Sequence, residues 1–337
     1  MPVRLKDIAD DLKLSKMTIS KVLRGQTDVS AETKARVLQR VKELNYRPNV
    51  TARSLRTGQT FTMGLIVPSM RETYWSEVAA GIDQVVRVAG FGLVVCPAQD
   101  DLEVEQQQLE LLLARQVDAL LIVSLQESAS FFNQVFKGQT VPLIFVNRRL
   151  PGATGSFVGV HEEEVGHLAC EHLIASGCRR IAYFRGPRTP IGDLRYIGFR
   201  EALSDAGLLF HPELIVDGMD TEAAEYRRGF DGMIRLLAGR GRPDGVMAYT
   251  DMMAIGAIDA SLSRGVSIPE GIAFVGSGND GRVCEMKVPL TSVDLAGHEV
   301  GQKAGRMALR LVTGSSGAGT RRVLVSPWLV ERSSSTR

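Results

Sequence analysis

Residues 5–24, LKDIADDLKLSKMTISKVLR, hold two short helical patterns separated by three or four residues, and this run constrains the chain more than any other. Ile8 and Leu12 line one face of the first pattern. Ser15 is a candidate N-cap for a second helix that would run to about Arg24. Two helices so close together predict a compact helical hairpin at the start of the chain.

The outer side of the second predicted helix suits a DNA major groove. At about 100° per residue, Ile19 and Val22 point to one side of this helix. Cations, hydroxyls and a thioether occupy the opposite side and its flanks: Lys16, Met17, Thr18, Ser20 and Lys21. Such groups can hydrogen-bond bases and phosphates. A helical hairpin with a solvated basic face is the alternative interpretation.

A third helix and the charge distribution favour the DNA-binding interpretation. Ser30 is a candidate N-cap, and Val37 and Leu44 at i, i+7 spacing could cover the first two helices. Residues 1–60 contain 13 Lys and Arg against 6 Asp and Glu, whereas residues 61–337 contain 27 against 32. A basic head on an acidic body is typical of a nucleic-acid-binding module.

The segment after the third helix has the pattern of a short linker helix. Pro48 ends the preceding element, Asn49 can cap a new one, and residues 50–56 would form two turns before Gly58. So few residues do not make a stable isolated helix. We therefore expect this segment to fold only when two copies meet on DNA. A merely flexible tether is the alternative.

From Phe61 onward, short apolar strands alternate with amphipathic helices, which favours parallel sheets covered on both faces. The length of this part suggests two lobes rather than one oversized sheet. The predicted strands are 62–68, 91–97, 119–124, 142–147, 180–185, 245–250 and 272–276. The predicted helices include 75–89, 104–116, 164–176, 192–206 and 252–264.

The chain resembles the lactose-repressor (LacI/GalR) family over nearly its whole length. The head segments that carry the resemblance are KDIADDLKLSKMTISKVLRG, VSAETKARVLQRVKELNYRPN and ARSLRTGQT. Those of the body are MGLIVP, FGLVVCPAQDD, VDALLIVS, PLIFVNRRLPG, GCRRIAYFRGP, DMMAIGAI, IPEGIAFVG and PLTSV. The resemblance implies an all-α helix-turn-helix head and an α/β two-lobed core with parallel sheets, similar to periplasmic binding proteins.

The resemblance also implies three crossovers between the lobes, an effector in the cleft and dimerisation along one face of both lobes. It places Asn49, Ala52 and Leu55 in a hinge helix that pairs across the dimer axis in the minor groove, with Leu55 as the apolar wedge. We expect a head at 1–48, a hinge and linker at 49–60, a core at 61–332 and a frayed polar tail at 333–337. Lobe one would span about 61–160 and 291–321, and lobe two about 162–290 and 322–332.

Polar side chains that follow the predicted strands are candidates for the effector site, because ligands of open parallel sheets bind at the carboxyl ends of the strands. Tyr74 and Trp75 could give a stacking surface, and Arg195 could grip hydroxyls or a carboxylate. The full predicted set is Tyr74, Trp75, Arg148, Arg195, Asp251 and Asn279. Taken singly, each is more often a helix cap or a surface charge.

Several positions depart from the pattern of the family that the chain resembles. Many members have an Asp-Asn pair where His161 and Glu162 stand, and an acidic residue where Gly278 stands. The missing carboxylate at Gly278 favours a phosphorylated, acidic or otherwise unusual effector, or a degenerate site, over a neutral sugar in the usual manner. Lys21 stands where relatives usually carry Arg, so guanine recognition is expected to differ.

The sequence predicts no catalytic residue, no metal site and no cofactor. His161, His167 and His172 give one tempting spacing, but the last two fall on different helix faces and no HExxH occurs. The segment GSGND at 276–280 lacks the lysine of a phosphate-binding loop. The four cysteines are scattered without a CxxC spacing, which is typical of reduced thiols.

We predict a homodimeric transcriptional regulator, a repressor, whose heads each read half of a pseudo-palindromic double-stranded operator. Lys16 and Ser20 would lie nearest phosphates, and Met17, Thr18 and Lys21 nearest bases. Its DNA affinity would be controlled by a small-molecule effector, a sugar, sugar acid or sugar phosphate.

The start MPVRLKD has no apolar signal region and no run reaches 18 apolar residues, so we expect a cytoplasmic protein with no membrane partner. Two other functions are weighed: a cytoplasmic carbohydrate-binding protein without regulatory DNA binding, and a hydrolase or isomerase on an α/β scaffold. The second lacks a catalytic constellation.

Overall fold

The structure is a computed structural model that describes residues 3–23, 28–46, 54, 57–186, 189–217, 225–239, 241–314 and 320–336. The chain forms two compact units, residues 1–60 and residues 61–337. Each unit is described by itself below.

The described part of the first unit is a helical head whose predicted N-caps are confirmed. Its helices are α1 (Leu5–Leu12), α2 (Lys16–Leu23) and α3 (Ala31–Glu43). Ser15 Oγ accepts the N–H of Thr18 at 3.0 Å, and Ser30 Oγ accepts the N–H of Thr33 at 3.3 Å. Apolar side chains from all three helices form the core of the head: Ile8, Ala9, Ile19, Val22 and Val37.

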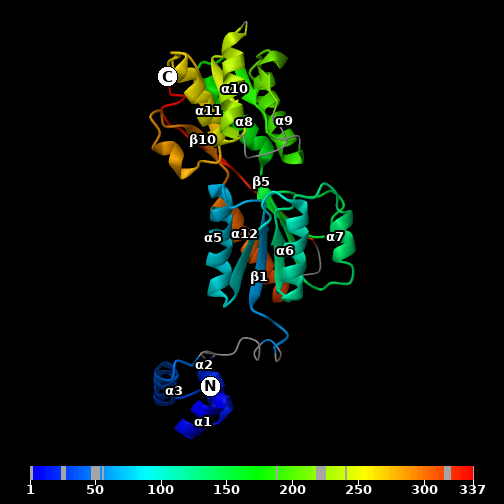
Figure 1. The fold of residues 1–337 in the computed structure, drawn as a ribbon, viewed down its shortest axis with the longest axis vertical. Helices are drawn as coiled ribbons and strands as arrows, with labels where there is room; N and C mark the ends of the chain where they lie inside the picture. Colours follow the sequence, from blue (N-terminus) through cyan, green and yellow to red (C-terminus); the bar gives the residue numbers. More distant parts are fainter. Residues whose placement is uncertain are drawn as a thin grey trace. The chain divides into compact units, whose positions relative to one another are not determined.

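The second unit contains two six-stranded sheets, one in each lobe (Figure 1). The sheet of lobe one is fully parallel, in the order β11 (Arg322–Val325), β5 (Ser156–Val160), β4 (Leu143–Val146), β3 (Ala119–Ile122), β1 (Thr62–Val67), β2 (Gly92–Pro97). The sheet of lobe two has the order β12 (Trp328–Val330), β10 (Thr291–Asp294), β9 (Ala273–Ser277), β8 (Gly245–Ala248), β6 (Ile181–Phe184), β7 (Ile215–Val216). Only the β10–β12 pair in this sheet is antiparallel.

Helices cover both faces of each sheet, as the continuous apolar strands predict. Lobe one has α5 (Thr73–Val88), α6 (Leu102–Ala114), α7 (Ser130–Val135) and α12 (Gly297–Val312). Lobe two has α8 (Glu162–Ala175), α9 (Pro190–Asp205), α10 (Glu225–Ala238), α11 (Asp251–Ser263) and short 3₁₀ helices at Pro212–Leu214 and Gly281–Cys284. In β3, Ala119 and Leu121 pack with α5 and α12, whereas Leu120 and Ile122 pack with α6 and α7. The predicted fold class is confirmed.

The predicted lobe boundaries are wrong by one strand on each side. β10 was expected in lobe one, but it pairs with β9 and β12 in lobe two. β11 was expected in lobe two, but it pairs with β5 in lobe one. The chain therefore crosses between lobes after β10 and again after β11. Thr291 and Ser292 of β10 are polar yet 0% exposed, which hides this strand from a search for apolar runs.

The expectation of a frayed C-terminal tail is also wrong. Ser334 and Ser335 are 0% exposed. Ser334 Oγ donates to the carbonyl of Phe274 at 2.7 Å and accepts the N–H of Thr291 at 2.8 Å. Ser335 Oγ lies 2.7 Å from His172 Nε2 on α8. The serines form internal hydrogen bonds that replace those to water, so a polar sequence packs as an interior segment.

The described part of the chain contains no helix that is both long and apolar enough to cross a bilayer.

Candidate DNA-binding face and effector cleft

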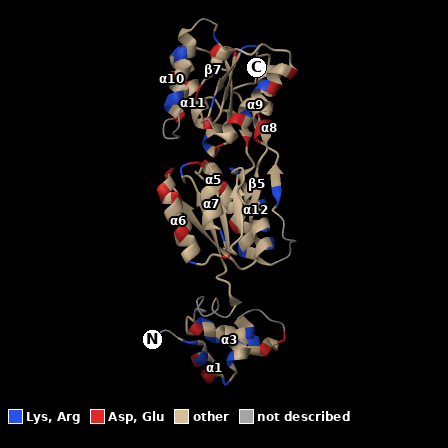
Figure 2. Cartoon of the chain, turned by 90° about the vertical axis from the view of Figure 1, so that its right-hand side faces the viewer, with Lys and Arg blue, Asp and Glu red and all other residues tan. Residues whose placement is uncertain are grey.

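The predicted DNA-contacting side of α2 is the side that the core of the head leaves accessible. Ile19 and Val22 are 0% and 2% exposed, whereas Met17 is 65% exposed. Lys16 is also exposed, and the remaining three residues of the predicted set, Thr18, Ser20 and Lys21, are partly exposed. Lys and Arg residues are spread along the helices of the head (Figure 2). The face offers cations and hydroxyls together.

Lys21 is not a free cation in this structure, because it forms an ion pair with Asp28. Both side chains are partly exposed, so the pair is weak and exchangeable. A DNA base or phosphate at this place would have to displace Asp28. The predicted hinge residues Asn49, Ala52 and Leu55 lie outside the described residues.

In the second unit, a cavity of about 470 Å³ is lined by residues of both lobes. Loops at the carboxyl ends of the strands and the first turns of several helices form its wall. Five of the six predicted effector residues line it: Tyr74, Trp75, Arg148, Arg195 and Asp251. At the ends of the strands, the folded chain thus brings together predicted side chains that are up to 177 positions apart in the sequence.

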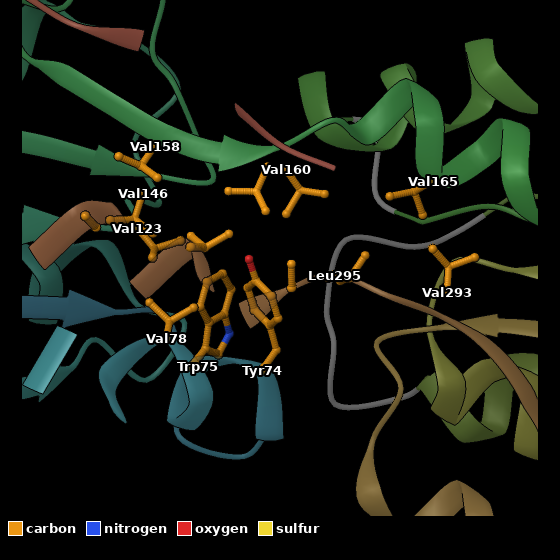
Figure 3. Packing of buried hydrophobic residues seen from close by; sticks show 14 of the residues in the cluster. Tyr74, Trp75, Val78, Val123, Val146, Val158, Val160, Val165, Val293 and Leu295 are labelled. Carbon is orange, nitrogen blue, oxygen red and sulfur yellow. The ribbon is translucent and has the colours of Figure 1, made fainter. Parts of the chain in front are cut away.

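Tyr74 and Trp75 form one wall of the cavity, but they do not present an open stacking face. Each is 8% exposed, and the two rings meet edge to face with 4.8 Å between centroids. Figure 3 shows both rings packed among apolar side chains that include Val123. The Tyr74 hydroxyl donates to Asn147 Oδ1 at 2.9 Å. Burial raises the pKa of Tyr74 far above its ordinary value, so this hydroxyl stays protonated.

Arg195 is held from three sides inside lobe two. Its Nε donates to Glu162 Oε2 at 2.5 Å and its Nη1 to the carbonyl of Tyr249 at 2.9 Å, and the guanidinium lies over the Tyr249 ring, 4.5 Å from the centroid. Burial by itself would lower the pKa of Arg195, but the charge of Glu162 raises it above its ordinary value. The charge of Arg195 is therefore balanced within the protein.

Asp251 is a buried carboxylate at the wall of the cavity. It is 4% exposed, its Oδ1 accepts from the Ser292 hydroxyl at 2.6 Å, and its Oδ2 accepts the N–H of Asp280 at 2.9 Å. Burial raises the pKa of Asp251 to about 6. A side chain at Gly276 would collide with Asp251, because a Cβ there would lie 2.2 Å from Oδ1.

Asp280 and Arg282 form a second charged pair at the cavity. Arg282 Nη2 donates to Asp280 Oδ2 at 2.7 Å, and the Thr73 hydroxyl donates to the same oxygen at 2.6 Å. The hydrogen bond from Arg282 holds the pKa of Asp280 well below its ordinary value. Thr73 belongs to lobe one and Asp280 to lobe two, so this hydrogen bond joins the two lobes across the cavity.

The sixth predicted effector residue, Asn279, is not among the residues that line the cavity. Its Nδ2 donates to Asp294 Oδ2 at 2.7 Å, and its Oδ1 accepts from Arg332 Nη2 at 2.7 Å. Asn279 follows β9 as predicted, but its side chain is used within lobe two. The structure therefore does not bring its side chain together with the other five predicted residues.

Two of the histidines whose spacing was considered for a metal site, His167 and His172, contact other side chains instead. His167 Nε2 lies 3.4 Å from Asp205 Oδ2, and His172 contacts Ser335. Within the described ranges, no group of three or more His, Cys, Asp and Glu side chains could hold a metal ion.

Comparison with known proteins places both units in one family. Residues 4–49 match the family described as bacterial regulatory proteins, lacI family, and residues 170–335 match a periplasmic binding protein-like domain. The chain is 30% identical over 301 residues to the HTH-type transcriptional repressor PurR of Pasteurella multocida (strain Pm70), with 89% of each chain covered. The chain belongs to the lacI family of bacterial regulatory proteins. It is also 30% identical over 333 residues to the ribose operon repressor of Escherichia coli (strain K12), covering 98% of this chain and 99% of that one.

Solved structures of lacI-family proteins share the fold over the whole chain. The Lac repressor dimer bound to operator and the anti-inducer ONPF matches with a TM-score of 0.83 and 25% identity, covering 100% of both chains. The complex of the transcriptional regulator CelR with cellobiose matches with a TM-score of 0.73 and 26% identity, covering 98% and 99%. The lacI family is a family of DNA-binding transcriptional regulators, so the predicted class of protein is confirmed.

Three residues of this lacI-family chain hydrogen-bond to predicted site residues although no sequence pattern assigned them a role. They are Glu162, Tyr249 and Ser292. Glu162 follows β5 and Ser292 lies in β10, and neither strand was predicted. The usable signal for Glu162 was a polar residue just after SFVGV, a short run of strand-forming residues. Tyr249 contributes its carbonyl and its ring face, which residue type alone does not predict.

Proposed function

We propose that this regulator is a repressor that binds a pseudo-palindromic operator as a homodimer and releases or holds it according to a small molecule in the cleft. One observation carries the proposal. A single chain joins a head with an accessible, cation-bearing α2 to a core with a cavity lined by both lobes. Likeness to the Lac repressor dimer on its operator and to CelR with cellobiose supports this division of labour.

For the head, we propose that α2 enters the major groove. Met17, Thr18 and Lys21 would read bases, whereas Lys16 and Ser20 would position the helix on phosphates. Two heads related by a two-fold axis then read two half-sites, which is why a palindrome is expected. The hinge residues Asn49, Ala52 and Leu55 are proposed to lie in the minor groove between the half-sites.

For the core, we propose that a sugar or sugar derivative binds between the lobes, where Arg195 and Asp251 face polar groups of the ligand. A ligand that contacts both lobes favours one angle between them over another. If the two angles place the hinge segments differently, effector affinity and DNA affinity are coupled by the same free energy in both directions.

The test is a selection of duplexes from a random pool with the full-length protein, followed by titration of the winning duplex. The result expected is an enriched palindrome with an affinity roughly 10³-fold or more above that of a scrambled duplex. Sedimentation of the protein on that duplex should give two chains per site. Failure to enrich any sequence over random competitor would refute the proposal.

Single lysines separate base reading from phosphate contact. Lys21→Ala should relax preference at one position of each half-site by roughly 1–3 kcal/mol. Lys16→Ala should weaken all duplexes alike and reduce the slope of log affinity against log salt by about 1 for each chain bound. Lys42→Ala on the exposed side of α3 removes the same charge outside α2 and serves as the control. If the three substitutions weakened all duplexes equally, the head would bind DNA by nonspecific charge attraction only.

A further inference from the structure

Arg148 is a cation without a partner at the wall of the cavity. It is half-buried, it lines the cavity, and its Nε is buried without a hydrogen-bond partner. Among the described residues, its side chain makes no hydrogen bond and no ion pair, and only the backbone N–H is used, toward Val146. Burial lowers the pKa of Arg148, which reflects the unfavourable surroundings of the charge. Charges in such positions are normally paired.

The surroundings of Arg148 form a built pocket rather than a mobile surface. β3 and β4 are parallel neighbours with Ile122 opposite Phe145, so Arg148 and the segment 123–125 leave the sheet side by side. Glu105, 0% exposed, fixes that segment by accepting from the Ser124 hydroxyl at 3.0 Å and the Leu125 N–H at 2.5 Å. Its carboxylate is thereby occupied.

The other described charged residues that line the cavity are three arginines and six acids, and two of the arginines form ion pairs with acids of the lining. Arg195 pairs with Glu162, and Arg282 pairs with Asp280. In the part of the chain that the structure describes, lobe two therefore offers no unpaired arginine to the cavity, and its acids Glu225 and Asp251 also line it. On lobe one, Arg71 also lines the cavity, and its charge acts on Asp100, whose pKa is raised by burial. Glu105 and Glu127 are the acids whose fields reach Arg148, and neither forms an ion pair with it.

We propose that the effector of this regulator carries an anionic group, a carboxylate or a phosphate, and that Arg148 on lobe one binds it. The guanidinium offers a planar fork of donors that matches either group. The polar remainder of the ligand would face Arg195 and Asp251 on lobe two, so one molecule would contact both lobes. This inference rests on the proposed function, because it names the chemistry of the effector proposed there.

The test compares matched neutral and anionic probes on the full-length protein. The probes are glucose, gluconate and glucose 6-phosphate, then ribose and ribose 5-phosphate, and inorganic phosphate as the bare anion. Binding is followed by melting temperature and by the change in tryptophan fluorescence, because Trp75, one of the two tryptophans, lines the cavity. The variants are Arg148→Gln, Arg148→Lys and, as a matched control, Arg149→Gln. Arg149 is the adjacent residue, is exposed and is not among the residues that line the cavity.

The result expected is that at least one anionic probe binds while its neutral parent at the same concentration does not. Arg148→Gln should weaken that binding roughly 10- to 100-fold, Arg148→Lys less, and Arg149→Gln not measurably. Retained affinity in Arg148→Lys shows that the site is still folded.

Three results would overturn the inference: neutral and anionic probes binding equally, Arg148→Gln binding as well as the unchanged protein, or no anionic probe binding at all. Operator titration of the same samples separates this failure from failure of the proposed function. If the protein binds its operator specifically but shows no preference for anionic probes, the proposed function stands and only the proposal of an anionic effector is refuted.

Discussion

At the scale of single residues, Asp251 gives the core a pH dependence whose sign can be worked out. Its pKa is about 6 in the folded chain, and an unfolded Asp has about 3.9. Between these values the folded state keeps a proton that the unfolded state releases, so stability falls as pH rises from about 4 to about 6. Above that window the stability contribution of this group is constant.

Asp251→Asn should therefore remove a loss of roughly 2 kcal/mol in the free energy of unfolding between pH 4 and pH 7. Urea unfolding of both proteins at several pH values measures this, because the other titrating groups cancel in the difference. Asp231→Asn, on the exposed side of α10, is the control that should leave the pH profile unchanged. Parallel profiles for Asp251→Asn and the unchanged protein would contradict the assignment.

Residue positions after strands could be predicted, but side-chain directions could not. Asp251 and Asn279 both follow strands of lobe two, and both were predicted to face the effector. Asp251 lines the cavity, whereas Asn279 turns to Asp294 and Arg332. Asn279 has a backbone φ of +50°, in the left-handed region, where its side chain turns to these two partners. No strand or helix pattern in the sequence encodes this conformation.

At the scale of elements, the crossing of α8 and α9 holds the buried Glu162–Arg195 pair in place. Gly166 and Gly198 lie at this crossing, where the two helix backbones touch. A Cβ at Gly198 would lie 1.9 Å from the carbonyl oxygen of Glu163, and one at Gly166 would lie 2.0 Å from that of Arg195. The pairs α5–α12 and α10–α11 cross in the same way.

Gly198→Ala should lower the free energy of unfolding by about 3 kcal/mol or more, because neither backbone can move aside without moving a whole helix. Gly281→Ala is the matched control, since a Cβ there meets nothing within 4 Å. It should change stability by less than about 0.5 kcal/mol. Denaturant unfolding measures both. A Gly198→Ala protein as stable as the control would mean that the helices are not in backbone contact.

The strands that were predicted are buried through apolar side chains, although β5, which is also apolar and buried, was missed. All seven predicted strands are present because each is an uninterrupted apolar run, and the five predicted helices are present with slightly earlier starts. β10 was missed because the buried hydroxyls of Thr291 and Ser292 donate to the Arg332 carbonyl and to Asp251, residues far away in the sequence. The tail was misjudged for the same reason. Burial of polar side chains depends on partners that only the folded chain brings together.

At the scale of the whole molecule, the two lobes of the core are joined by three described crossovers, after β5, after β10 and after β11. At the second one, Asp294 Oδ1 accepts the N–H of Ala296 at 2.8 Å while its Oδ2 accepts from Asn279. Asn279 in turn accepts from Arg332, whose Nη1 donates to the carbonyl of Leu290 at 2.7 Å. A change of angle between the lobes has to pass through this crossover, so the chain of hydrogen bonds limits how freely it bends.

Asn279→Ala should therefore loosen the crossover without unfolding either lobe. Removing the amide leaves the partly buried Asp294 and Arg332 without this partner, which costs about 1–3 kcal/mol. Hydrogen exchange of the Ala296 amide should accelerate by at least about tenfold, because local opening there no longer breaks the whole chain of bonds. Asn133→Ala, which removes a hydrogen bond to the Gly152 carbonyl in lobe one, is the matched control and should leave that amide unchanged. If Asn279→Ala lowered global stability while the Ala296 amide kept its protection, the bonds would stabilise lobe two alone. The connection between effector and operator would then have to pass through the other two crossovers.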